Sequence, residues 1–493
     1  MNSQDRKAVI IKDTSKYSLA QYAAQAIGFL TAFFMRKFLG PYQMGIWSLL
    51  KVAQGYLGYL QLGVESAAVY RIPFYKGKSD VAAETETKDT AFSFMFLMSV
   101  FSSIALAIAA LLVRKHYPLE VIVGLLSLAL YVILQRLYSF YIITLRAYRN
   151  FSVLTKSLLF DAIVNLILVV LLVKFFKIYG LYITISILAV LNTLFVGRLS
   201  GYKLNFKFVF KRFKELTVYG FPLLIGGFLG EILSTIDSIM IAKMMGVVFV
   251  GYYSVALMTK NCIYGLSNNL GIVTIPHMQE VYGKSGDMEE IKKFVTHSVK
   301  VISYLLSPIL GITYFIAPFF VTIFLPKYIP GIAALQILLL NTFFLSCSAQ
   351  SGQFLVTIGK QSRLIIISVA AIILNIFFNF YFIKIGLGIS GVALGTSFSS
   401  FFVFTAMLIY AMKHFANFRD IFKFIVNILL APFYMISIIY FCDSLKITGL
   451  SSISLLTFQL IVMAFASLPL VIYINKETGV LHLIFEAIVK RFK

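Results

Sequence analysis

Fourteen long apolar runs divide the chain, and each is close to the length that crosses a bilayer. A helix needs about twenty apolar residues to span the hydrocarbon core. The runs cover residues 17–38, 43–73, 91–113, 118–146, 152–173, 178–197, 217–243, 251–282, 294–325, 331–358, 363–383, 389–412, 421–441 and 452–474. In lipid all backbone polar groups must be hydrogen-bonded within the protein, which only α-helices and closed β-barrels achieve. Apolar runs of this length favour helices. The sequence therefore predicts an all-α integral membrane protein with about 14 transmembrane helices.

Composition supports this class. Of the 493 residues, 60% are hydrophobic and 13% are charged, whereas soluble domains are about half apolar and about a quarter charged. The net charge of +23 does not indicate nucleic acid, because the basic residues gather in short loops between the apolar runs. We therefore expect no nucleic-acid partner.

The alternation of basic loops also predicts the topology. Loops that hold most of the Lys and Arg residues face the cytoplasm under the positive-inside rule. Applied from the basic N-terminal segment onward, the rule places both termini in the cytoplasm and requires an even number of spans. Fourteen spans fit best, and twelve remain possible if one terminal pair is misread. The tail 476–493 is expected to lie on the cytoplasmic surface as an amphipathic segment.

Catalytic chemistry has no visible support in the sequence. The longest loop, 198–216, has about twenty residues, which is too short to fold as a soluble catalytic domain. The three cysteines and five histidines show no metal-ligand spacing. We expect no metal and no cofactor, and we interpret the chain as a transporter and not as an enzyme. A membrane-embedded transferase would need a clustered His/Asp site or a larger loop.

An internal repeat organises the chain. The segment Lys37-Phe-Leu-Gly40-Pro-Tyr-Gln-Met-Gly45-Ile-Trp47-Ser48 matches Lys243-Met-Met-Gly246-Val-Val-Phe-Val-Gly251-Tyr-Tyr253-Ser254 at Lys, both Gly, the aromatic residue and Ser. Asn165 and Asn375 match in the same order further along. The repeat unit is six spans, and an even unit gives both copies the same orientation. The predicted domains are a six-helix bundle at 1–200, a second at 201–415, an extra helix pair at 416–475 and the tail 476–493.

Polar residues inside the apolar runs are the candidate site, because charges at membrane depth are costly and normally face a cavity or a partner. In the second span, Lys51, Gly55, Gly58, Leu62 and Glu65 would share one face of a continuous helix. Two glutamines, Gln54 and Gln61, flank that face.

The eighth span carries a similar polar face. Lys260 and Tyr264 lie on it, with Asn261 and Asn268 beside it. The repeat places Lys260 within one turn of Lys51 in depth. We therefore expect the two lysines to bind one anionic group between the bundles; the alternative is that both lysines snorkel to the membrane surface.

Three further ionisable residues, Arg136, Asp161 and Asp237, lie within the apolar runs. Arg136 in the fourth span either pairs with Asp161 of the fifth span or binds the substrate. In the seventh span Asp237 lies deepest and, together with Glu65, is a candidate carrier of a coupling H+ or Na+.

The motifs that surround the repeat resemble those of bacterial polysaccharide (O-antigen-type) flippases. The resemblance lies in Arg36-Lys-Phe-Leu-Gly40-Pro-Tyr-Gln-Met-Gly45-Ile-Trp47-Ser-Leu, in Leu62-Gly63-Val-Glu65-Ser-Ala and in Asp237-Ser-Ile-Met-Ile-Ala. It continues in Gly251-Tyr-Tyr253-Ser-Val-Ala256 and follows nearly the whole chain in order. One departure is Gln61, where many members have Asp, so an acidic role at that position is not expected.

That resemblance implies a fold, a function and a location. The family belongs to a superfamily with multidrug/toxin-extrusion transporters and lipid II flippases. Its fold is two six-helix bundles, related as parallel repeats and arranged in a V shape, here followed by a C-terminal helix pair. The implied function is alternating-access transfer of an undecaprenyl-diphosphate-linked oligosaccharide to the outer leaflet of the bacterial cytoplasmic (inner) membrane. Lys51, Lys260 and Arg136 would bind the diphosphate, membrane lipids would surround the chain, and a polysaccharide polymerase could act beside it.

Two other transport functions stay open. A multidrug/ion antiporter of the toxin-extrusion type would be expected to use acidic residues to bind organic cations, whereas this chain places several cations within its spans. A lipid II flippase would share the charge pattern and differ in the sugar.

Overall fold

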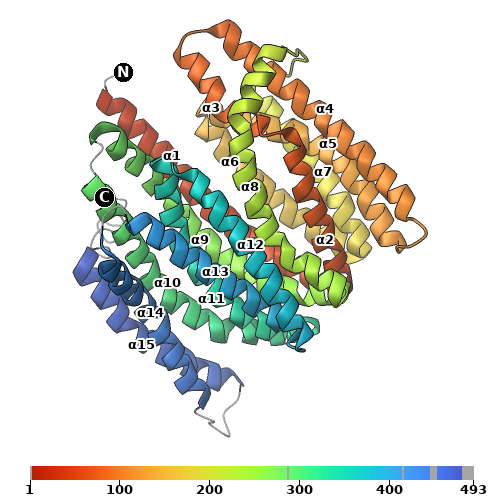
Figure 1. The fold of residues 1–493 in the computed structure, drawn as a ribbon. Coiled ribbons are helices and arrows are strands. Elements are labelled where there is room, and N and C mark those ends of the chain that lie inside the picture. The colour runs from red at the N-terminus through yellow and green to blue at the C-terminus, as the bar shows by residue number, and fades with distance from the viewer. Residues whose placement is uncertain (1–2, 286–287, 414–415, 445–451, 480–493) are drawn as a thin grey trace. The chain divides into compact units, whose positions relative to one another are not determined.

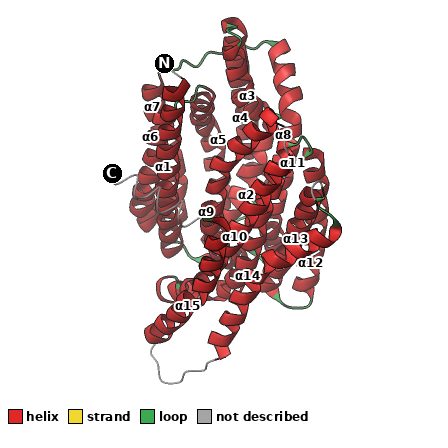
Figure 2. Cartoon of the chain, turned by 90° about the vertical axis from the view of Figure 1, so that its left-hand side faces the viewer, coloured by secondary structure: helices red, strands yellow, loops and turns green. Residues whose placement is uncertain are grey.

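The computed structural model describes residues 3–285, 288–413, 416–444 and 452–479, and these residues form helices joined by loops, with no strand among them (Figures 1 and 2). The helices of the first half are α1 Ser3–Phe38, α2 Pro41–Leu57, α3 Val64–Gly77, α4 Val81–Val113, α5 Leu119–Ala147, α6 Phe151–Leu168 and α7 Lys174–Ser200. Those of the second half are α8 Phe210–Met244, α9 Val247–Ser285, α10 Met288–Phe324, α11 Ile332–Thr357, α12 Gln361–Lys384, α13 Gly388–Met412, α14 Phe418–Ser444 and α15 Ser452–Thr478.

The lengths of these helices confirm an integral membrane protein. Ten helical segments in the described part of the chain are long and apolar enough to cross a membrane. One of them, Phe151–Ser200, contains two predicted spans, which separate at Lys177, where the backbone leaves the helical region (φ 53°, ψ −132°). The predicted spans that are not among the ten correspond to α1, the α2–α3 pair and α9. The chain is therefore an all-α integral membrane protein of about fourteen helices, as predicted.

The second predicted span is broken, and here the sequence-based expectation of one continuous helix is wrong. After α2 the chain makes a 3₁₀ turn at Gly58–Gln61, and then Leu62 (φ 52°) and Gly63 (φ 76°) adopt left-handed conformations before α3 begins. A left-handed backbone is strained for Leu and natural for Gly. Because the helix is interrupted, Glu65 does not continue the face of Lys51 at 100° per residue.

A close backbone approach accompanies the break. A Cβ atom on Gly63 would clash with the carbonyl of Gly220 in α8, and a Cβ on Gly220 would clash with the carbonyl of Gly63. Glycine at both positions allows α8 to pack directly against the broken span.

The chain forms two compact units, Met1–Ser254 and Val255–Lys493. Helix pairing within them follows the predicted repeat: α5 packs along α7 in the first unit and α11 along α13 in the second, and α6–α7 corresponds to α12–α13 in the same way. The first helices of the two repeats differ, because α1 packs along α6 whereas α8 packs along α2, α3 and α4. The compact first unit therefore extends beyond residue 200, and the boundary inferred from the repeat stays a prediction.

The repeat is visible in one reciprocal contact inside the first unit. A Cβ on Gly45 would clash with the carbonyl of Val247, and a Cβ on Gly251 would clash with the carbonyl of Pro41. The predicted register aligns Gly45 with Gly251 and Pro41 with Val247. The two copies therefore make the same contact with exchanged roles, as expected for elements related by a pseudo-twofold axis.

In the second unit, the extra helices α14 and α15 both pack against α10. Between α10, α11 and α14 lies a cavity of about 430 Å³. Its wall is mostly apolar, and Gln336, Tyr314 and Asp443 contribute polar atoms. The tail beyond residue 479, predicted to lie on the membrane surface, is outside the described residues.

Candidate substrate-binding site

The predicted site residues fall in both compact units. The first unit contains Lys51, Gln54, Gln61, Glu65, Arg136 and Asp237, and the second contains Lys260, Asn261, Tyr264 and Asn268. Each group is described within its own unit.

Lys51 of α2 combines an exposed side chain with aromatic neighbours. Its Nζ donates a hydrogen bond to Gln54 Oε1 at 3.0 Å. The same ammonium lies 5.3 Å from the centroid of the Trp47 ring and 6.0 Å from that of Tyr131 in α5. Asp161 of α6 is near enough to act on Lys51 electrostatically. Lys51 therefore remains available to an anion while aromatic faces and one carboxylate offset part of its charge.

Arg136 of α5 pairs with Glu65, so the pairing with Asp161, one of the two alternatives drawn from the sequence, is wrong. Arg136 Nη1 donates to Gln61 Oε1 at 2.8 Å and to Glu65 Oε2 at 3.0 Å. Asp161 instead accepts a hydrogen bond of 2.5 Å from Asn192 Nδ2 in α7. The cause is the break in the second span, since α3 packs against α5 and directs its first turn at Arg136.

The Arg136 contacts bracket the two left-handed residues of the break. Gln61 ends the 3₁₀ turn, and Glu65 lies in the first turn of α3. The Arg136 side chain is 11% exposed, whereas that of Glu65 is 42% exposed. A largely buried guanidinium with a carboxylate partner is better suited to hold this backbone in place than to supply a free cation.

Asp237 and Glu231 of α8 occupy different surroundings. Asp237 is buried and accepts a hydrogen bond of 2.9 Å from Tyr253 Oη. Glu231 is half-buried and lies against Gly55 of α2, where any Cβ would collide with the Glu231 carboxylate. Gly55 is one turn from Lys51, so Glu231 enters the polar face of α2. The sequence showed Glu231 only as a charge in the seventh span; its position depends on how α8 packs.

Two tyrosines extend this packing of α8 on the second span. Tyr56 Oη and Thr235 Oγ1 are 2.9 Å apart, and Tyr59 Oη donates to the carbonyl of Gly227 at 2.8 Å.

The predicted site residues of the second unit lie on α9. Lys260 and Tyr264 are half-buried, and Asn261 is exposed. The Asn268 side chain lies outside the described residues.

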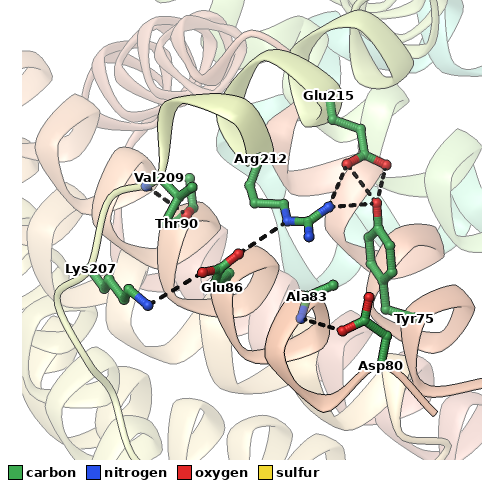
Figure 3. Close-up of polar contacts among 9 residues, drawn as sticks. All are labelled: Tyr75, Asp80, Ala83, Glu86, Thr90, Lys207, Val209, Arg212 and Glu215. Atoms are coloured by element: carbon green, nitrogen blue, oxygen red, sulfur yellow. Dashed lines mark hydrogen bonds and ion pairs between the residues drawn. The ribbon is translucent and has the colours of Figure 1, made fainter. Parts of the chain in front are cut away.

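A second polar cluster, which sequence reasoning missed, joins α8 to α3 and α4 at the end predicted to be cytoplasmic (Figure 3). Tyr75 Oη lies 2.5 and 2.6 Å from the two carboxylate oxygens of Glu215 and accepts a bond of 3.0 Å from Arg212. Arg212 also pairs with Glu86 at 3.4 Å, and Arg71 pairs with Glu215 at 3.3 Å. Burial and the Glu215 carboxylate raise the pKa of Tyr75.

This cluster was not evident in the sequence because its members come from three helices and have no common spacing. The loop basic residues were assigned to topology alone. Charge in such loops satisfies the positive-inside rule whether or not each residue has a partner.

Comparisons with known proteins identify the family and the fold. The profile of a family described as polysaccharide biosynthesis protein matches residues 77–328, just over half of the chain. Among solved structures, the lipid II flippase MurJ in an inward closed conformation superposes with a TM-score of 0.73 at 16% identity, covering 94% of this chain and 99% of that one. No curated protein matches the sequence.

Two further structures share the fold. An inward-facing multidrug resistance transporter of the MATE family, in the MOP superfamily, has a TM-score of 0.66 at 14% identity and covers 82% of this chain and 99% of its own. A MOP superfamily transporter from Pyrococcus furiosus has a TM-score of 0.61 at 14% identity, with coverage of 82% and 95%. The fold of this chain is therefore the one that these transporters and the lipid II flippase share.

Within that class, the chain belongs to the polysaccharide biosynthesis protein family. The resemblance to polysaccharide flippases drawn from the sequence is confirmed.

Proposed function

We propose that this protein transfers an undecaprenyl-diphosphate-linked oligosaccharide from the cytoplasmic to the outer leaflet of the bacterial inner membrane, with both termini in the cytoplasm. The observation that carries the proposal is Lys51, an exposed cation within a predicted membrane span, surrounded by Trp47, Gln54 and Tyr131. An exposed ammonium at this depth indicates an anionic substrate group, because its cost in the membrane has to be offset by a partner.

Each chemical part of such a substrate has a matching feature. A diphosphate accepts charge-assisted hydrogen bonds from the three donors of an ammonium. Sugar rings stack on aromatic faces, which Trp47 and Tyr131 provide beside Lys51. Lys260 of the second unit is a further candidate for the anion, and this role remains a prediction. Arg136 acts on the substrate indirectly, through the backbone that it holds between Gln61 and Glu65.

The isoprenoid chain requires an apolar surface. The cavity between α10, α11 and α14 has mostly apolar walls, formed by residues such as Leu310, Phe343 and Met435. It exists because the extra helix pair packs on α10, which makes α14 part of its wall. We place part of the lipid tail there.

The decisive experiment replaces Lys51 and measures flipping. Purified protein in proteoliposomes would receive a fluorescent lipid-linked oligosaccharide, and transfer would be followed by protection from an added glycosidase. A charge-assisted hydrogen bond contributes about 1.5–3 kcal/mol, so Lys51→Ala should slow transfer about ten- to a hundredfold, and Lys51→Arg should retain part of it.

A lysine away from the polar face serves as the matched control. Lys177 is exposed and donates to the carbonyl of Phe38 at 3.3 Å, so Lys177→Ala should transfer substrate at the wild-type rate. Full activity of Lys51→Ala at wild-type protein level would contradict the proposal. Parallel vesicles with lipid II separate the two flippase substrates: faster transfer of lipid II would assign the protein to that substrate instead.

A second candidate, ion-coupled drug extrusion, is favoured by the carboxylates of Glu231 and Glu65, which are both partly accessible. Carboxylates bind organic cations and carry protons. A coupling role for Asp237 or Glu65 would appear as loss of gradient-dependent transfer in Asp237→Asn or Glu65→Gln. Extrusion of a cationic dye at a rate unchanged by lipid-linked oligosaccharide would support the drug transporter and contradict the flippase.

A further inference from the structure

The segment that joins the two repeats has an unusual pattern of charge and aromatic residues. Residues 201–214 read Gly-Tyr-Lys-Leu-Asn-Phe-Lys-Phe-Val-Phe-Lys-Arg-Phe-Lys and contain no acidic residue. Residues 201–209 form no helix, and α8 begins at Phe210. The chain therefore presents a basic, aromatic segment that leads without helix into the first turn of α8.

Contacts with α4 set the depth of this segment. Phe206 packs on Phe92 and Phe96, with ring centroids 4.9 and 5.3 Å apart. The backbone N–H of Lys207 donates to Ser93 Oγ at 3.0 Å. The backbone N–H of Val209 donates to Thr90 Oγ1 at 3.1 Å (Figure 3).

That stretch of α4 marks the boundary of its apolar run. Charged residues continue to Asp89, and the apolar run begins at Ala91. A segment bound beside Thr90 and Ser93 therefore lies where the headgroups of a bilayer meet its hydrocarbon core.

The outward side chains are suited to that interface. Phe206, Phe208 and Phe210 are 68%, 51% and 69% exposed on the protein surface. Aromatic area of this size is unfavourable in water and is covered at a lipid interface.

The basic side chains of the segment form two groups. Lys207 and Arg212 pair with Glu86 at 3.5 and 3.4 Å. Lys203, Lys211 and Lys214 are exposed, and none of them has a carboxylate partner in the part of the chain that the structure describes. Three unpaired cations therefore lie beside exposed aromatic rings.

We propose that residues 201–214 are a docking surface for anionic phospholipid headgroups of the leaflet that they face, predicted to be cytoplasmic. Lys203, Lys211 and Lys214 bind the headgroup phosphates, and Phe208 and Phe210 enter the acyl boundary. Clusters of basic residues at the cytoplasmic surface bind anionic lipids, and aromatic residues anchor such segments at the interface. The charge of the segment selects an anionic surface over a zwitterionic one.

The test is native mass spectrometry of the whole purified protein with phosphatidylglycerol and, separately, phosphatidylcholine. Each basic residue near an anionic surface strengthens binding roughly fivefold. The wild type should bind phosphatidylglycerol more tightly, and the variant K203Q/K211Q/K214Q should lose about a hundredfold of that affinity. F208S/F210S should weaken the binding of both lipids.

The matched control removes the same charge at the opposite, predicted outer, ends of helices. Lys115, Lys174 and Lys384 are exposed, and K115Q/K174Q/K384Q should bind phosphatidylglycerol as the wild type does.

Three results would overturn the proposal. They are equal wild-type affinity for the two lipids, equal losses in the two triple variants, and displacement of phosphatidylglycerol by an isoprenyl diphosphate at far lower concentration. The last would make the segment a capture site for the transported lipid. Elution of the 201–214 variants as single species in size-exclusion chromatography would show that they fold.

Discussion

Two sets of three helices that the repeat relates to each other use polar residues in opposite ways. In the first unit, α5, α6 and α7 carry Arg136, Asp161 and Asn192, of which two are charged. In the second unit, α11, α12 and α13 are joined by neutral amides and hydroxyls. Asn341 donates to Ser400 at 2.6 Å, and Asn375 donates to Thr396 at 3.2 Å.

The neutral polar residues of α11–α13 join helices, whereas the charged residues of α5–α7 lie at a candidate binding site. The neutral groups of α11–α13 are buried, and Asn379 donates to Asn375 at 2.9 Å within the same network. Hydrogen bonds between neutral groups are a common means of joining membrane helices. The charged set lies beside the exposed Lys51 and the part-exposed Glu65. Charges at membrane depth are costly and normally face a partner or a cavity, so this set marks a candidate site. The same helix pairing therefore supports a tight interface in one unit and a candidate binding site in the other.

The largest effect within this comparison is expected at Arg136. Arg136→Ala leaves Gln61 and Glu65 without their donor, and a hydrogen bond to a charged group contributes about 1.5–3 kcal/mol. We expect a fall of about 2–3 kcal/mol in the free energy of unfolding, measured by thermal unfolding in detergent, together with loss of transfer.

A double variant checks the cause. Removing both partners of an ion pair costs less than leaving one of them alone, so R136A/E65Q should be more stable than Arg136→Ala. Equal stability of the two would show that the pair does not hold the break at Leu62–Gly63.

A smaller effect, on transport only, is expected at Asp161. Asp161→Asn keeps an oxygen for Asn192 and removes the negative charge beside Lys51. Thermal stability should change by less than about 1 kcal/mol, while the affinity for lipid-linked diphosphate should rise several-fold because Lys51 loses a competing carboxylate. Binding would be measured by titration with a fluorescent isoprenyl diphosphate. An unchanged affinity would show that the Asp161 carboxylate does not weaken the binding of diphosphate to Lys51.

The smallest effect is expected in the neutral network. Asn375→Ala removes the amide that bonds Thr396 and Ser399, and interhelical bonds of this kind average about 0.6 kcal/mol in membrane proteins. We expect stability to fall by about 1 kcal/mol at most, with transfer unchanged. Asn165, which the repeat aligns with Asn375, is only half-buried, and Asn165→Ala is the control. A transport defect in Asn375→Ala would contradict the assignment of the α11–α13 network to helix packing alone.

The sequence predicted the class of the protein and the repeat because both depend on spacing along the chain. Apolar runs of about twenty residues need only a bilayer to become helices. The repeat register aligned Gly45 with Gly251, and the structure shows that both glycines lie in close backbone contacts. Lys51 and Gln54 were found together because they lie on one uninterrupted helix.

Only the tertiary structure decided the rest. The predicted continuous helical face from Lys51 to Glu65 ends at Leu62 and Gly63, where the backbone is left-handed. This turn lies where Gly220 of α8 contacts Gly63. The partner of Arg136 and the position of Glu231 followed from that packing. Hydrophobicity determines which segments enter the membrane, because the transfer of each apolar run from water to lipid depends on the residues of that run alone. The choice of partner for a charge depends on the angle and contact of helices far apart in sequence, and no local pattern specifies it.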